Sequence, residues 1–155
     1  MAEINKVVVR DLEGNVIKGS TQDFYVERPT FRVVLPNGVD TVPIKLADLK
    51  AVFFVKELDG NQVRARAKEF AETDANRANN RPVAVVFKDG ELLVGYANSY
   101  SNERLGFFVL PASSEDNTLR VFVIRNATKA IKLGPAAEEL VRKVAAERDA
   151  KSDAA

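Results

Sequence analysis

Side chains able to do acid, base or nucleophilic chemistry are scarce in this chain, which contains no histidine and no cysteine. Their absence excludes Ser-His-Asp and Cys-His catalysis, soft-metal sites and a disulfide framework. Paired carboxylates remain at Asp11/Glu13 and Asp89/Glu91, but each pair lies beside a glycine, where acidic residues commonly form turns. We therefore expect no enzyme, and we assign no catalytic residue, metal or cofactor.

Two further chemical patterns are weak. Glu115, Asp116 and Asn117 offer oxygen ligands for a hard cation, although a solvated loop is the simpler interpretation. The glycines form neither a P-loop nor a Gly-x-Gly-x-x-Gly motif, so the sequence indicates no nucleotide cradle.

The best binding candidate is a Glu-Arg pair that occurs twice, each time three residues after an aromatic side chain. The candidate residues are Phe24, Glu27, Arg28, Tyr100, Glu103 and Arg104. An exposed arginine beside an aromatic ring holds a phosphate or a base plane, or anchors a protein interface. In the alternative interpretation, which we favour, the pair stabilises a turn through an ion pair or backbone hydrogen bonds.

These pairs belong to a segment that is written twice. At an offset of 76 residues, Val7, Val9, Gly14, Gly19, Glu27, Arg28, Phe31 and Val33 coincide with identical residues at Val83, Val85, Gly90, Gly95, Glu103, Arg104, Phe107 and Val109. The repetition predicts two copies of one structural unit.

Each copy has the pattern of five short strands. In the first copy, strands are expected at 6–10, 16–21, 31–35, 42–46 and 49–55, with Gly14 in a tight turn, Gly19 at a bulge or bend and Pro43 on an edge strand. In the second copy they are expected at 82–87, 92–97, 107–110, 119–125 and 129–133. A longer loop at 112–118 raises the offset of the last two strands to 79.

The rest of the chain predicts helices and linkers. Helix-forming residues at 61–72 and a polar stretch at 73–81 indicate a linker, and Pro135 suits the first turn of a helix. The expected units are a first barrel at 6–57, a linker at 58–81, a second barrel at 82–133, an amphipathic helix at 135–149 and a disordered tail at 150–155. The long apolar strand 51–55 is expected to be core rather than a ligand pocket.

The two copies differ on one sheet face. Arg10, Lys18 and Arg32 of the first copy correspond to Val86, Val94 and Phe108 of the second. This exchange predicts a wet face in the first copy and a covered one in the second. The cover is either the C-terminal helix, through Leu140, Val141 and Val144, or a partner chain.

Composition predicts a globular protein, with 46% hydrophobic residues and a net charge of +1. No apolar run approaches the roughly 20 residues that cross a bilayer, and the first ten residues lack a signal-peptide pattern. We expect a cytoplasmic location and no membrane association. Basic residues are not clustered, so the signal for nucleic-acid binding is weak.

The segment VAVVFKDGELLVGYANSYSNERLGFFVL resembles the first motif of Sm-like barrels, and VVVRDLEGNVIKGSTQDFYVERPTFRVVL is a looser copy. The resemblance implies a mainly β fold of two tandem SH3-like or Sm-like small β-barrels from an internal duplication, with a linker helix and a C-terminal helix. It also implies RNA binding as an alternative function, through the loops around Arg28 and Arg104.

The chain from 6 to 133 is also similar to an uncharacterised bacterial domain family, on the segments DLEGNVIKGSTQDFYVERPTF, LKAVFFVKELDGN and FKDGELLVGYANSYSNERLGFFVLPASSEDNTLRVFVIRNATKAIKL. This similarity implies a fold and a bacterial origin but no reaction. The sequence thus favours a non-enzymatic binding or adaptor module that recognises a protein partner, with a homo-oligomer left open.

Overall fold

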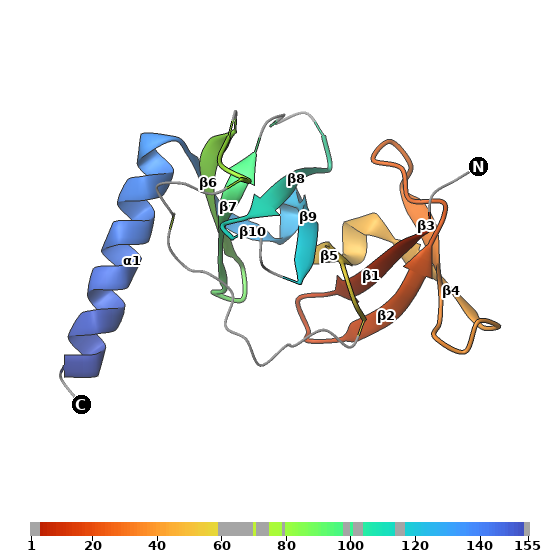
Figure 1. The fold of residues 1–155 in the computed structure, drawn as a ribbon. Coiled ribbons are helices and arrows are strands. Elements are labelled where there is room, and N and C mark those ends of the chain that lie inside the picture. Colours follow the sequence, from red (N-terminus) through yellow and green to blue (C-terminus); the bar gives the residue numbers. More distant parts are fainter. Residues whose placement is uncertain are drawn as a thin grey trace.

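The computed structural model describes residues 4–58, 70, 75–78, 80–97, 100, 104–113 and 117–153, which form ten antiparallel strands and one C-terminal α-helix (Figure 1). The strands of the first copy are β1 (Asn5–Arg10), β2 (Val16–Thr21), β3 (Thr30–Val34), β4 (Thr41–Lys45) and β5 (Ala51–Val55). Those of the second copy are β6 (Arg81–Phe87), β7 (Leu92–Ala97), β8 (Gly106–Pro111), β9 (Thr118–Ile124) and β10 (Thr128–Leu133). One 3-10 turn precedes the fifth strand of each copy, at Leu46–Asp48 and at Arg125–Ala127.

The ten strands lie in one open sheet, in the order β10-β6-β7-β8-β9-β5-β1-β2-β3-β4. The expected mainly β fold is confirmed, but the sheet is open and does not close into the two expected small barrels. The reason lies in β5, which pairs with β1 on one side and with β9 of the second copy on the other. Because the second edge of β5 is occupied by β9, it is not available to close the first copy on β4.

The two copies nevertheless pair their strands in equivalent registers. Val7 lies opposite Phe54, and Val83 lies opposite Leu133 in the same way. In the last hairpin of the copies, Phe31 lies opposite Ile44 and Phe107 lies opposite Val123 (offsets of 76 and 79). Each copy thus has its strands in the order fifth, first, second, third, fourth.

Two repeated glycines fix the path of the second strand. Of the bulge or bend expected at Gly19, the bulge is absent, because the β1–β2 register runs through this residue without a shift. A Cβ atom at Gly19 would overlap the carbonyl oxygen of Val34, and one at Gly95 would overlap that of Leu110. Glycine is needed here because the third strand crosses the second at very short range.

The first-turn glycines serve a different purpose. Gly14 and Gly90 both have φ of +94°, as tight hairpin turns require, which agrees with the expectation for Gly14.

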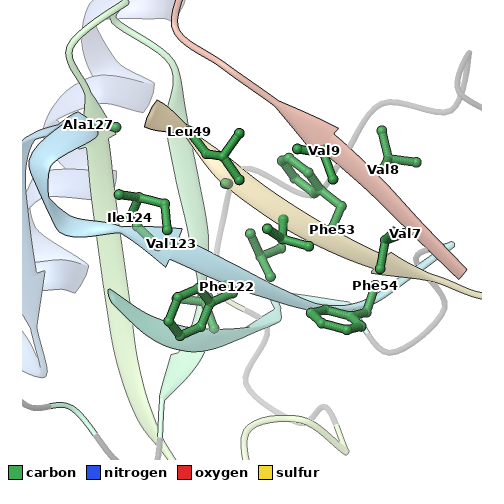
Figure 2. Close-up of a cluster of buried hydrophobic side chains, with 14 of the residues drawn as sticks. Val7, Val8, Val9, Leu49, Phe53, Phe54, Phe122, Val123, Ile124 and Ala127 are labelled. Atoms are coloured by element: carbon green, nitrogen blue, oxygen red, sulfur yellow. The ribbon is translucent and has the colours of Figure 1, made fainter. Parts of the chain in front are cut away.

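The two copies share one hydrophobic core. Its residues come from both copies, and all five residues of β5 are buried, which agrees with the expectation that 51–55 is core. Figure 2 shows side chains of β1, β5 and β9 meeting in this core, including Val9, Phe53, Phe54 and Phe122. Burying both faces of β5 and of residues 121–124 of β9 removes a large apolar area from water, which favours one cooperative unit.

A second, smaller core lies under helix α1 (Pro135–Asp153), next to β6 in Figure 1. Ala137 and Val141 pack there with Ala84 and Val94, and Leu140 packs against them. Helix α1 therefore covers Val94 of the second copy, as predicted. The exchanged Phe108 instead joins the shared core.

In the first copy, all three exchanged residues are at least partly exposed, and Lys18 is half-buried. Arg32 is exposed and bonds Asp23, with 3.3 Å between Nε and Oδ2. Arg10 is half-buried, with its guanidinium 5.5 Å from the centre of the Phe53 ring.

The helix begins at the expected Pro135 and continues to Asp153, so residues 150–153 are helical rather than a disordered tail. Of the predicted linker helix at 61–72, only Phe70 belongs to the described residues, and it packs against the core under α1. Among the described helices, none combines the length and apolarity needed to cross a membrane.

Candidate functional site

The predicted binding residues that the structure describes separate into a half-buried and an exposed group. Phe24 lies in an aromatic cluster with rings from both copies: Phe31, Phe54, Phe108 and Phe122, at centroid distances of 5.1, 5.2, 6.2 and 5.3 Å. Arg120 of β9 lies over two of these rings, 4.5 Å from Phe54 and 4.6 Å from Phe108. Phe24 is half-buried, and its ring joins the first copy to the second.

Tyr100, the counterpart of Phe24, also contacts its own strands. Its ring is 5.1 Å from that of Phe107, edge to face, which matches the contact between Phe24 and Phe31. Arg125 donates a 2.7 Å hydrogen bond from Nη1 to the Tyr100 hydroxyl and lies 5.1 Å from the ring centre. Its Nε donates to the carbonyl oxygen of Arg104 at 3.1 Å.

The turn around Arg28 has an exposed aromatic ring that the sequence interpretation did not include. The Arg28 guanidinium lies 4.6 Å from the centre of the Tyr25 ring, and Tyr25 is 48% exposed. The Arg28 backbone N–H donates to the Tyr25 carbonyl at 3.0 Å. Glu27 and Arg28 are both exposed, and in the part of the chain that the structure describes they form no ion pair.

The structure therefore brings Tyr25, Glu27 and Arg28 together on one exposed turn, which we call the Tyr25–Arg28 turn. It does not join this turn to Tyr100 and Arg104, which are held by Arg125 in the second copy. Glu103 lies outside the described residues. Tyr25 was visible in the sequence three positions before Arg28, but its spacing alone did not show that its ring is exposed.

A second feature is a buried lysine at the junction of the copies. Lys50 precedes β5, and its side chain is 4% exposed. Its Nζ lies 2.7 Å from Oδ2 of Asp89 and 2.6 Å from Oε2 of Glu91, both in the β6–β7 turn, and 4.8 Å from the centre of the Phe87 ring. The lysine thus fastens the first turn of the second copy to the last strand of the first.

This ion cluster changes the acidity of its partners. The hydrogen bond from Lys50 lowers the pKa of Asp89 below its usual 3.8, and the N–H of Glu91 lowers it further. A lone lysine between Leu49 and Ala51 in an apolar run was a visible signal. Its acidic partners were not visible as such, because they lie 39 and 41 residues away in the chain.

The other carboxylate pair forms a turn. Asp11 accepts hydrogen bonds of 2.9 Å from the backbone N–H groups of Glu13 and Asn15, and one of 2.8 Å from the Asn15 amide. The bonds from Asn15 lower the pKa of Asp11. Within the described residues, acidic side chains form no cluster of three that would hold a metal ion. The cation alternative at Glu115 and Asp116 lies outside them.

The comparisons with known proteins place the chain in a family. Residues 3–134 match the model of a family of unknown function, DUF6982, and the chain belongs to this family. No curated protein matches the chain, and no solved structure does. The family match covers both copies of the repeat, so the one-sheet arrangement of the two copies lies within the family domain.

Proposed function

We propose that this protein is a non-enzymatic binding or adaptor module that recognises a protein partner through the Tyr25–Arg28 turn. The observation that carries the proposal is the exposed Tyr25 ring with the Arg28 guanidinium 4.6 Å from its centre. Tyrosine and arginine are enriched among the residues that dominate protein interfaces. The tyrosine ring buries a large area and loses little side-chain entropy.

A non-enzymatic role is supported by the state of the buried lysine. The Lys50 amine is held by two carboxylates within hydrogen-bond distance and is 4% exposed. An amine held in this way presents no free nucleophile to a substrate. Its role in the proposal is to join the two copies.

RNA binding is the second candidate. It is favoured by the same Arg28–Tyr25 stack, since exposed aromatic rings and arginines hold bases in single-stranded RNA. A protein partner is the stronger proposal, because the second copy does not repeat the platform: at the offset of 76, Tyr25 corresponds to Ser101, which has no aromatic ring. The net charge of +1 also offers little counterion release.

We further propose that each copy is an opened SH3-like or Sm-like unit and that the protein works in the cytoplasm of a bacterium. The strand order fifth, first, second, third, fourth in both copies supports the first point. The absence of cysteine fits a reducing compartment.

The test is affinity capture from native bacterial lysate with the full chain, with and without nuclease, followed by identification of bound proteins. We expect one protein to be enriched, to survive nuclease and to be lost with Tyr25→Ala plus Arg28→Ala. The matched control is Arg142→Ala on the exposed side of α1, which should retain the protein. Retention by the Tyr25→Ala, Arg28→Ala variant contradicts the proposed site.

The RNA candidate has a separate readout. Binding of a mixed single-stranded RNA should be measured by fluorescence anisotropy between 50 and 200 mM salt. RNA binding predicts an affinity that falls steeply with salt and drops with Arg28→Ala plus Arg104→Ala. No binding at the lowest salt removes this candidate and leaves the protein-binding proposal intact.

A further inference from the structure

The two ends of the sheet are a matching pair of edges. Inside the chain, β9, the fourth strand of the second copy, pairs with β5, the fifth strand of the first. The two strands left at the ends of the sheet are β4, the fourth strand of the first copy, and β10, the fifth strand of the second. Figure 1 shows β4 at the end of the molecule opposite α1.

We propose that a second copy of this chain binds at these edges, so that β4 of one molecule pairs with β10 of another and repeats the internal β5–β9 junction. This proposal is independent of the Tyr25–Arg28 turn. Because β4 and β10 differ, the contact is head to tail, and further molecules can add by the same contact until it closes on itself.

The internal register predicts the register between molecules. Ala51 lies opposite Val123 in the β5–β9 pair. With the offset of 79 residues, Ala130 of one molecule would lie opposite Ile44 of the next. The backbone geometry supports this pairing. The N–H of Gly134 donates to the carbonyl oxygen of Pro82 at 2.8 Å, so Gly134 directs its N–H toward β6. Because N–H directions alternate along an antiparallel strand, Ile131 and Leu133 direct theirs to the outer side of β10.

The two edges carry opposite charges at the positions that correspond to the ion pairs of the internal junction. Lys50 of the internal junction is bound by Asp89 and Glu91. At the offset of 79, the counterpart of Lys50 is Lys129, which is exposed at β10. At the offset of 76, the counterpart of Asp89 is Glu13, which is exposed in the β1–β2 turn. The proposed contact would bring Lys129 of one molecule to Glu13 of the next.

One residue weakens the contact. Ile124 donates its N–H to Lys50 across the internal junction, so Phe122, two residues earlier, also turns its backbone toward β5. The counterpart of Phe122 is Pro43, which has no N–H to donate. Proline on an edge strand limits indiscriminate pairing. The contact between molecules is therefore reversible and weaker than the internal one.

The test is sedimentation equilibrium of the full chain, from micromolar concentrations to about 1 mM, the range in which weak associations are half formed. We expect the average mass to rise above that of one chain. Lys129→Glu and Glu13→Lys should each raise the dissociation constant about tenfold, and the double variant should restore it to within about threefold. Lys143→Glu on the exposed side of α1 is the matched control and should change nothing.

A variant that associates more tightly than the natural chain cannot be explained by misfolding. Pro43→Val restores the missing N–H and should tighten the association about fivefold, the equivalent of one hydrogen bond. Circular dichroism checks that each variant is folded. A natural chain that stays at the mass of one chain up to about 1 mM overturns the proposal. A dissociation constant that stays the same in Lys129→Glu, Glu13→Lys and Pro43→Val also overturns the proposal.

Discussion

At the residue scale, Lys50 carries a charge into a site where its side chain is 4% exposed. Burying an ammonium group is unfavourable unless nearby carboxylates balance its charge. Asp89 and Glu91 do so, while their own side chains stay 33% and 41% exposed. The lysine therefore depends on its partners more than they depend on it.

This asymmetry predicts the effect of removing either side. Lys50→Met keeps the apolar stem and lets the carboxylates hydrate, so it should lower the free energy of unfolding by about 1 kcal/mol or less. Asp89→Asn plus Glu91→Gln leaves the ammonium buried without a countercharge and should cost roughly 3 kcal/mol. Urea denaturation of both variants measures the difference. A larger cost for Lys50→Met would contradict this view of the junction.

The same cluster predicts a dependence on pH. Because Lys50 lowers the pKa of Asp89 in the folded state, the unfolded chain binds more protons below the usual value of 3.8. The stabilisation is present above about pH 4 and is lost as the pH falls through the folded pKa. Urea midpoints between pH 7 and pH 2 should fall less for Lys50→Met than for the natural chain. An equal decrease of the urea midpoint in both proteins would show that Lys50 does not cause the pH dependence at Asp89.

The candidate site illustrates what residue types reveal and what they do not. The repeated aromatic and Glu-Arg residues were correctly singled out as a pattern. However, the half-buried rings of Phe24 and Tyr100 contact Phe31 and Phe107. Spacing along the chain does not tell whether an aromatic ring meets another ring or a ligand, since both need the same apolar side chain. Tyr25, the exposed ring, has no counterpart in the repeat pattern.

At the scale of elements, the third strand of each copy approaches the second so closely that no side chain fits between them. A Cβ at Gly19 would lie 2.6 Å from Cγ1 of Val33, and one at Gly95 would lie 2.6 Å from Cγ1 of Val109. The repeated geometry explains why glycine occupies both positions.

We expect Gly19→Ala and Gly95→Ala each to lower the free energy of unfolding by about 2 kcal/mol or more, because backbone and core must shift. Thr30→Ala, at an exposed position of β3, is the control and should change it by less than about 0.5 kcal/mol. Chemical denaturation at pH 7 compares the three variants. Unchanged stability of Gly95→Ala would mean that the close crossing is not rigid.

Strand positions were largely predictable from the sequence, because apolar runs, turn glycines and the repeat all mark them. The partner of β5 was not. An apolar strand has the same pattern whether its second edge pairs inside its own copy or with the other copy, and all five residues of β5 are buried in the observed arrangement. Closure into barrels was therefore a reasonable expectation that long-range pairing with β9 overrode.

At the scale of the whole molecule, the two copies form one sheet and share one core. Rings from both copies meet around Phe24, Arg120 of β9 lies over Phe54 of β5, and Lys50 reaches the first turn of the second copy. These contacts predict that neither copy opens alone. The buried residues of the two copies therefore form one cluster.

The most direct test of this account is native-state hydrogen exchange of the backbone amides in β1 and β6, the strand next to the fifth strand in each copy. One cooperative sheet predicts that the slowest amides of both strands open with the same free energy, within about 1 kcal/mol, and that this value equals the free energy of global unfolding. Two separate plateaus, with the amides of one copy exchanging at a distinctly lower free energy, would contradict it.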